Sequence, residues 1–253
     1  MLIHARNPGP LTGDGNNTWL LDGDEPALVD AGIGAADHVD AVAGALRGRA
    51  LARVLVTHHH ADHASGVPAL VARWPALEAA KFPLEGESGW RPLADGDTID
   101  TGRASLVVLH TPGHAPDHVC FWDGTTGSLY AGDMVIAGTT VMIPAGRGGG
   151  LRAYLASLER LASLGPARIC PAHGPVIDRP LDLIREYLEH RRLRERQVLD
   201  CLARGTADPD AIVATIYGSL TPAIFRAARQ TVEAHLEKIR EDDPKRFPAP
   251  RVD

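Results

Sequence analysis

The segment Thr57-His58-His59-His60-Ala61-Asp62-His63 places four imidazoles and one carboxylate within seven residues. Imidazole nitrogens and carboxylate oxygens are the ligands that Zn²⁺ and similar divalent cations prefer in proteins. The apolar, β-branched run at 51–56 predicts a short buried strand that ends just before these residues. Positions 58 and 60 lie two apart, so an extended chain would point both imidazoles the same way. The sequence therefore predicts a metal site at the end of this strand.

A helix is expected directly after this segment, over 65–74, because Pro75 cannot continue it. Asp62 and His63 then fall on the turn into that helix and can face a second ion while the first histidine pair holds one. The plainer alternative is a polar loop or a chance histidine run. The run is internal, follows a strand and contains an aspartate, and these features favour metal binding.

Three further motifs end in a histidine or an aspartate and each follows a strand-like run, where loops carry function on a rigid scaffold. In chain order they are Thr111-Pro112-Gly113-His114, Ala131-Gly132-Asp133 and Cys170-Pro171-Ala172-His173. Together with residues 57–63 they resemble, in order and spacing, the ligand motifs of the metallo-β-lactamase superfamily. The resemblance implies that family's αβ/βα sandwich, with the metal site at the edge between the two sheets.

The resemblance also implies a dinuclear centre. Its first ion would be held by His58, His60 and His114, its second by Asp62, His63 and His173, and Asp133 would bridge the two. Zn²⁺ is the favoured metal, and the same donors admit Fe²⁺ or Mn²⁺. Asp62 is the candidate catalytic residue, because it could also orient the attacking water and handle its proton. Five other histidines are expected to be ordinary surface or core residues: His4, His38, His110, His190 and His235. His59 is expected to face away from the site, and His118 is expected to be structural rather than a partner of a ligand.

The chemistry expected of two adjacent ions is hydrolysis. A metal-bound water loses its proton near neutral pH, and the resulting hydroxide attacks an ester, thioester, amide or phosphodiester. Hydride transfer is not expected, since no Gly-x-Gly-x-x-Gly follows a strand. β-Lactam hydrolysis is not expected either, because those enzymes carry Cys or Ser where this chain has Asp133. Two substrate contacts are weaker predictions: Asn17, on a strand that reaches the site, and Arg147, if the 145–150 loop is a lip over the site rather than a plain surface loop.

The composition fits a cytoplasmic enzyme. The chain of 253 residues contains no apolar stretch long enough to cross a bilayer and no signal-peptide core at its start. Its three cysteines are widely spaced and odd in number, which argues against a disulfide framework. Residues 1–184 carry 13 basic and 20 acidic side chains, a net charge of −7. A net negative charge disfavours nonspecific binding to the negatively charged phosphates of nucleic acids.

Two domains are predicted, a catalytic domain at 1–189 and a C-terminal helical module at 190–253. A long helix begins at Pro180 and runs to about residue 202. Asp208-Pro209 and Thr221-Pro222 each offer an N-cap followed by a proline at the first helical position. The helices that they start resemble a winged-helix module. We expect it to pack on the catalytic domain or to form a homodimer rather than to read DNA, because its last helix has few outward basic residues.

Several motifs resemble those of the β-lactamase-like protein 2 branch, among them Gly15-Asn16-Asn17-Thr18-Trp19-Leu20, Gly138-Thr139-Thr140-Val141 and His173-Gly174-Pro175-Val176-Ile177. This resemblance implies one of two activities, cleavage of single-stranded RNA or hydrolysis of acyl thioesters. The leading prediction is a zinc-dependent hydrolase of a small ester or thioester, supported by the acidic catalytic domain. The alternative is a single-strand endoribonuclease, supported by the branch and by the C-terminal module. For the basic run near 191–196, a solvated, salt-bridged face is a plainer interpretation than RNA contact. A third hypothesis is a non-catalytic metal-binding regulator, which the complete ligand set disfavours.

Overall fold

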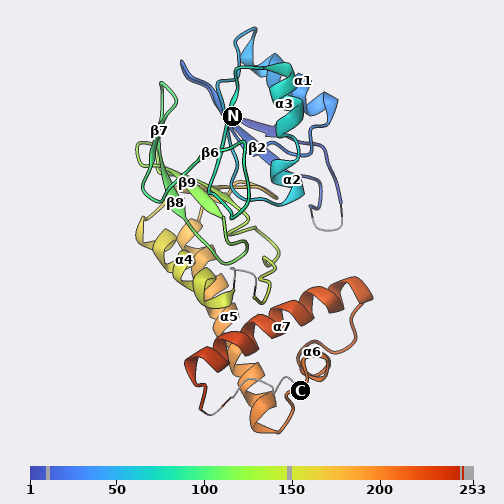
Figure 1. Ribbon diagram of the computed structural model, residues 1–253. Coiled ribbons are helices and arrows are strands. Elements are labelled where there is room, and N and C mark those ends of the chain that lie inside the picture. The colour runs from blue at the N-terminus through green and yellow to red at the C-terminus, as the bar shows by residue number, and fades with distance from the viewer. Residues whose placement is uncertain (10–11, 147–149, 246, 248–253) are drawn as a thin grey trace.

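The computed structural model describes residues 1–9, 12–146, 150–245 and 247, and it contains two mixed β-sheets packed face to face (Figure 1). The strands of the first sheet, in spatial order, are β1 (Leu2–His4), β2 (Asn17–Leu21), β3 (Ala27–Val29), β4 (Arg53–Leu55), β5 (Glu78–Lys81) and β6 (Arg91–Pro92). Those of the second sheet are β11 (Arg168–Pro171), β10 (Ser128–Gly132), β9 (Val119–Asp123), β8 (Ser105–His110) and β7 (Thr98–Asp100).

Helices cover the outer face of each sheet. Helices α1 (Ala36–Leu46) and α3 (Val67–Arg73) lie on the first sheet, and α4 (Leu151–Ser163) and α5 (Pro180–Ala203) lie on the second. Strand alternation divides the apolar side chains between the layers. On β2, Trp19 packs between the two sheets while Leu20 faces α1 and α3. The predicted αβ/βα sandwich is confirmed.

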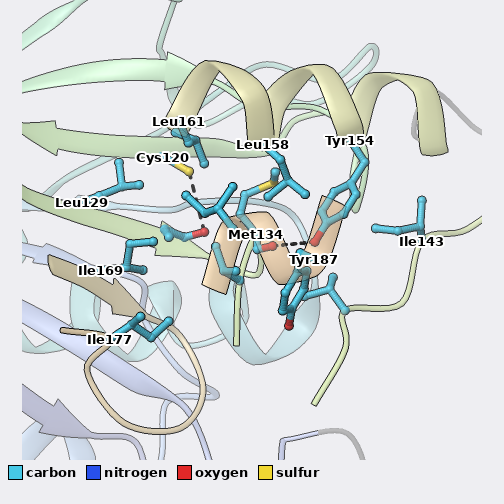
Figure 2. Packing of buried hydrophobic residues seen from close by; sticks show 14 of the residues in the cluster. Cys120, Leu129, Met134, Ile143, Tyr154, Leu158, Leu161, Ile169, Ile177 and Tyr187 are labelled. Atoms are coloured by element: carbon cyan, nitrogen blue, oxygen red, sulfur yellow. Dashed lines mark hydrogen bonds between the residues drawn. The ribbon is translucent and has the colours of Figure 1, made fainter. Parts of the chain in front are cut away.

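The layer between the second sheet and its helices supports the chain segment that follows β10. Figure 2 shows Tyr154 of α4 and Tyr187 of α5 packed around Met134, and the Tyr154 hydroxyl donates a hydrogen bond of 2.7 Å to the Met134 carbonyl oxygen. The same layer buries Cys120, whose thiol is free, like those of the other two cysteines. No disulfide forms, as the cysteine spacing predicted.

The single helix predicted at 65–74 is wrong in its start and its continuity. The chain forms α2 (Ala61–Ala64), which already contains Asp62 and His63, and then α3. Gly66 separates the two helices because it packs directly on the turn after β3. A Cβ at Gly66 would lie 2.1 Å from the Ala31 carbonyl oxygen, and the Gly66 N–H donates to the carbonyl of Gly32. This tertiary contact was not visible in the local sequence.

Strand β4 is also shorter than the predicted 51–56, and residues 57–59 form bends rather than extended chain. The common direction of His58 and His60 therefore comes from a turn, not from strand alternation. Four short strands carry no clear signal in the sequence: β1, β5, β6 and β7. Each has only two to four residues and no apolar alternation strong enough to mark it.

The C-terminal module consists of the end of α5 together with α6 (Pro209–Tyr217) and α7 (Pro222–Asp242) around a small core of its own. Asp208 caps α6 as predicted, since its carboxylate accepts a hydrogen bond of 2.9 Å from the Ala211 N–H. Thr221 occupies the N-cap position of α7 but its side chain makes no capping bond, which corrects that prediction. The predicted boundary at 189/190 falls within the continuous helix α5.

The module packs against the catalytic domain through α4 and α7 (Figure 1). Arg152 on α4 forms ion pairs with Glu241, at 3.0 Å, and with Asp242 of α7. The Gly146 N–H donates a bond of 2.9 Å to the carboxylate of Glu237. Such packing was one of the two uses predicted for the module. Among the described residues, no helix combines the length and the apolar character needed to cross a membrane.

Candidate metal centre

The candidate ligands meet at one edge of the sandwich because they follow the ends of strands from both sheets. His58 and His60 follow β4 of the first sheet, and Asp62 and His63 lie on the short helix α2. The second sheet contributes the residues after β8, β10 and β11, which are His114, Asp133 and His173. Residues that are far apart in sequence thus converge, and the strand ends hold them on a rigid frame.

The first cluster consists of His58, His60 and His114. His60 Nδ1 lies 2.9 Å from His58 Nε2 and 3.0 Å from His114 Nε2. Burial lowers the pKa of His58 well below its ordinary value, and burial together with the neighbouring His114 lowers the pKa of His60 to about 4. These two imidazoles are therefore neutral at physiological pH, and neutral imidazole is the form that binds metals.

The second cluster consists of Asp62, His63 and His173. Asp62 Oδ2 lies 3.4 Å from His63 Nε2 and 3.5 Å from His173 Nε2. Burial opposes ionisation of Asp62, but hydrogen bonding to His173 and His63 outweighs it and lowers the pKa of the carboxyl far below its usual range. Asp62 is consequently an ionised carboxylate that could bind a metal through oxygen, beside two imidazole nitrogens.

Asp133 lies between the two clusters. Its Oδ2 is 3.5 Å from His114 Nε2, and its Oδ1 is 3.3 Å from His173 Nε2 and 3.6 Å from His63 Nε2. The residue is only 8% exposed, and Oδ1 has no hydrogen-bond partner among the described residues. A buried, unpartnered carboxylate oxygen costs free energy that a cation would offset. The donors therefore fit a pair of divalent ions that share Asp133.

Buried polar groups behind the ligands fix their orientation. Asp30, 2% exposed, accepts a hydrogen bond of 2.8 Å from His63 Nδ1 and also binds the backbone N–H and hydroxyl of Thr57. His114 Nδ1 donates to the Met142 carbonyl oxygen at 2.9 Å, which leaves its Nε2 free to face the first cluster. Such outer partners set the tautomer and raise the basicity of ligating histidines.

The proton on His63 illustrates the effect of Asp30. Burial of the imidazole lowers its pKa, but the charges of Asp30 and Asp133 outweigh burial and raise the pKa of His63 well above its ordinary value. Without an ion, His63 therefore carries protons on both nitrogens. Binding of a cation at Nε2 must displace one of them, as is usual for histidine ligands.

Asn16 performs a similar role for Asp62. Its side-chain amide donates a hydrogen bond of 3.0 Å to Asp62 Oδ2, and its own carbonyl oxygen accepts from Asn7 at 2.7 Å. His118, which we predicted to be structural, accepts the backbone N–H of Asp133 at 3.1 Å and lies fully buried. It thereby holds the bridging candidate in place without facing the cluster.

The weaker site predictions fare differently. Asn17 donates to the carbonyls of Pro171, at 3.1 Å, and Gly174, at 2.8 Å, and so ties the loop that carries His173 to β2. Arg147 lies outside the described residues. His59 is 39% exposed on its side chain and binds Asp117 at 2.8 Å, away from the ligand clusters.

Asp30 and Asn16 were not among the predicted site residues. A usable signal for Asp30 exists: it is a charged residue directly after the buried strand β3, which neighbours β4 in the same sheet. Parallel neighbours end at the same edge, so this carboxylate had to lie near the histidines. Asn16 offers no comparable signal, because an asparagine before a strand is common in turns.

Asp30→Asn is expected to lower the affinity for the second ion by about 10- to 100-fold, the usual effect of losing a group that hydrogen-bonds to a ligating histidine. Metal titration by competition with a chromophoric chelator measures this. Asp117→Asn is the matched control, since Asp117 is also buried and also bonded to a histidine Nδ1, but that histidine, His59, is not in a cluster. Equal affinities in the two variants would contradict the role given to Asp30.

A cavity of about 570 Å³ adjoins His173, a size typical of small-molecule sites. Its lining comes from the N-terminal turn, the segment after β10 and the loop after β11. The lining residues are His4, Thr12, Gly13, Asp14, Gly15, Asn17, Ile136, Thr139, His173, Gly174 and Pro175. Substrate can thus approach the second cluster from this side.

Comparison with known families gives two matches. Residues 11–173 match the metallo-beta-lactamase superfamily, and residues 209–243 match the beta-lactamase associated winged helix domain. Among curated proteins, the chain is 34% identical over 250 residues to the lactamase-like protein aptB of Emericella nidulans, covering 93% of this chain and 79% of that protein. It is 31% identical to a beta-lactamase-like protein 2 homolog of Caenorhabditis elegans, covering 95% and 83%.

Solved structures show the same fold. The metallo-beta-lactamase family protein TTHA1429 of Thermus thermophilus superposes with a TM-score of 0.72 at 24% identity, covering 96% of this chain and 93% of that one. TTHA1623 in a di-iron-bound form superposes with a TM-score of 0.58 at 28% identity, covering 72% and 96%. The predicted fold, including its C-terminal winged-helix-like module, agrees with these matches.

Proposed function

The chain belongs to the metallo-β-lactamase superfamily, and on that premise we propose that it is a dinuclear metal-dependent hydrolase of a small ester or thioester. The observation that carries the metal-dependent part is the position of Asp133. Its Oδ2 faces the cluster of three histidines, its Oδ1 faces the cluster that contains Asp62, and Oδ1 is buried without a hydrogen-bond partner among the described residues. A pair of cations would compensate the charge of this buried carboxylate.

The proposed ligands are those that the sequence indicated, with Zn²⁺ as the favoured metal. The first ion would be held by His58, His60 and His114, the second by Asp62, His63 and His173, and both by Asp133. Ions bound there would supply Lewis-acid polarisation of the substrate carbonyl and a nucleophile that is ionised near neutral pH. TTHA1623, whose fold is similar, has been solved in a di-iron-bound form. The His and Asp donors of this chain also admit iron or manganese.

Asp62 is the proposed catalytic residue among these ligands. Its side chain is 25% exposed, in contrast to the fully buried His63, so one side of the carboxylate remains open to the site. Asn16 fixes Oδ2, and the lowered pKa keeps the group ionised. Asp62 can therefore accept a hydrogen bond from the attacking water and orient it.

The charge beside the site supports the proposed substrate class. Among the described residues that line the cavity next to His173, none is lysine or arginine, and Asp14 is exposed there. A phosphodiester chain is bound mainly by cationic side chains that neutralise its phosphates. This lining therefore favours an uncharged acyl substrate over RNA.

The basic run at 191–196 on α5 offers RNA only a small exposed basic surface. Arg191 is buried, and Arg194 is bonded to Gln197 at 2.7 Å and lies over the ring of Tyr217 at 4.5 Å. Arg192 and Arg196 remain exposed, so only half of the four arginines in the run are available to a nucleic acid. The endoribonuclease alternative keeps its support from the winged-helix match and from the similarity to beta-lactamase-like protein 2.

A substrate panel distinguishes the two. Metal-loaded protein is expected to hydrolyse p-nitrophenyl acyl esters or acyl thioesters, and His58→Ala is expected to reduce the rate at least about 100-fold, because loss of a metal ligand removes catalysis worth several kcal/mol. His59→Ala is the matched control and should retain the rate. Cleavage of labelled single-stranded RNA by wild type but not by His58→Ala, without ester or thioester turnover, would instead make the protein a nuclease.

A further inference from the structure

Arg191 occupies an unusual position for an arginine. It lies on α5, is 1% exposed, and forms no ion pair with a carboxylate among the residues that the structure describes. Its Nε and Nη1 have no hydrogen-bond partner there either. Burying an unpaired charge costs several kcal/mol, and an apolar side chain of similar volume is often at least as stable. Stability alone therefore does not explain this residue.

The hydrogen bonds that Arg191 does make go to the chain segment that follows Asp133. Its Nη2 donates to the Thr140 hydroxyl at 3.0 Å and to the Val141 carbonyl oxygen, and its guanidinium lies 5.5 Å from the ring centre of Tyr154. Thr140 and Val141 belong to the connector, which we define as residues 134–143. The connector follows Asp133 and contains no helix or strand.

The connector lacks the backbone hydrogen bonds of a helix or strand. Side chains from α4 and α5 bond to its backbone instead. The Tyr154 hydroxyl donates to Met134, and Tyr187 lies beside it in Figure 2. The Tyr187 hydroxyl accepts the Ile136 N–H at 3.1 Å and has the carbonyls of Ile136 and Thr139 at 2.8 Å to donate to. Arg191 provides the last of these supports, at residues 140 and 141.

The residue directly after this support faces the metal centre. The Met142 carbonyl oxygen accepts the Nδ1 proton of His114 at 2.9 Å. This bond selects the tautomer in which His114 Nε2 carries the lone pair, 3.0 Å from His60 Nδ1. The direction of the Met142 carbonyl depends on the peptide before it, whose oxygen Arg191 binds.

We propose that Arg191 is a positioning residue for the metal centre, acting through Val141 and Met142 on His114. Because α5 continues from the catalytic domain into the C-terminal module, the same contact couples that module to the first metal site. Arg191 also lies near α7: burial, with the charge of Arg191 next in importance, lowers the pKa of His235 to about 3. The inference rests on the proposed metal centre but not on the nature of the substrate.

The test measures metal binding and needs no substrate. Zn²⁺ affinities of both sites are determined by chelator competition for Arg191→Met, Arg191→Lys and Arg192→Met. The last variant is the control, because Arg192 is the neighbouring residue on α5, 61% exposed on its side chain and 3.8 Å from the carboxylate of Glu159. Thermal unfolding of each metal-free variant reports on folding separately.

Arg191→Met is expected to weaken one Zn²⁺ site by about 10-fold or more, while the other changes by less than about threefold. Its metal-free melting temperature should stay within a few degrees of wild type, since an unpaired buried charge is removed. Arg191→Lys, which keeps a cationic donor, should recover part of the affinity. In a His114→Ala background the substitution should have no further effect on the remaining ion.

Three outcomes overturn the proposal. The first is equal Zn²⁺ affinities in Arg191→Met and Arg192→Met. The second is parallel weakening of both sites with a lowered metal-free melting temperature, which would show a general structural role. The third is an undiminished effect of Arg191→Met in the His114→Ala background. Should Arg191→Met fail to fold, Arg191→Lys decides between the same alternatives.

Discussion

Asp133→Asn is expected to abolish hydrolysis, lowering the rate on the order of 1,000-fold or more, and to reduce the metal content to one ion per chain or fewer. The carboxylate oxygens face both clusters, at 3.5 Å from His114 and 3.3 Å from His173. An amide keeps one weaker acceptor and presents an N–H₂ group to the other cluster, so the shared negative charge is lost. Removal of metal-ion catalysis worth several kcal/mol gives this magnitude, at about 1.36 kcal/mol per factor of ten.

Asp123→Asn is the matched control for this substitution. Asp123 is also a buried aspartate, at the end of β9, where its carboxylate accepts the backbone N–H groups of Thr125 and Thr126. Its replacement should lower stability through that turn and leave the metal content at two. If Asp133→Asn retained two ions and wild-type turnover, the bridging assignment would be wrong.

Removal of metal is expected to lower the melting temperature by about 10 °C or more. Each ion at about 100 times its dissociation constant stabilises the folded state by about 2.7 kcal/mol. Two ions give about 5 kcal/mol, and roughly 1 kcal/mol corresponds to about 2–4 °C for a chain of this size. Differential scanning fluorimetry of metal-loaded and chelator-stripped protein measures the shift.

The expected fall in melting temperature also has a cause within the metal centre itself. Without ions, Asp133 Oδ1 stays buried without a hydrogen-bond partner among the described residues, and its ion-pair contacts to His173 and His63 remain long, at 3.3 and 3.6 Å. His58→Ala, which is left with one complete cluster, should show a smaller shift on stripping, whereas His59→Ala should match wild type. Identical melting temperatures with and without metal would contradict a centre that is bound to the folded state.

The part of the site that could be predicted from sequence is the part that is local. Residues 58–63 crowd four ligands into one turn, and their chemistry alone indicated a metal. His114, Asp133 and His173 are each single residues in short motifs, and only the resemblance to a family connected them to the cluster. The structure brings all of these side chains together.

What the sequence could not provide depends on contacts between distant elements. Asp30 and Asn16 act on His63 and Asp62 across 33 and 46 positions. The break between α2 and α3 arises because Gly66 packs on Ala31 from another element. The burial of Arg191, in a run that looked like a solvated or RNA-binding face, reflects the packing of α5 against the connector.

The C-terminal module shows the same division. Prolines at the first helical position marked the starts of α6 and α7 correctly. The cap at Asp208 forms and the one at Thr221 does not, a difference that side-chain identity alone does not reveal. The packing of α7 on α4, through Arg152 and Glu241, required the assembled structure.

The central claim, a two-ion centre built from these residues, is tested most directly by elemental analysis of protein purified without chelators. Wild type and His59→Ala are predicted to contain about two divalent ions per chain, and His58→Ala about one. A content near zero in the wild type, or equal losses in His58→Ala and His59→Ala, would contradict the site described here.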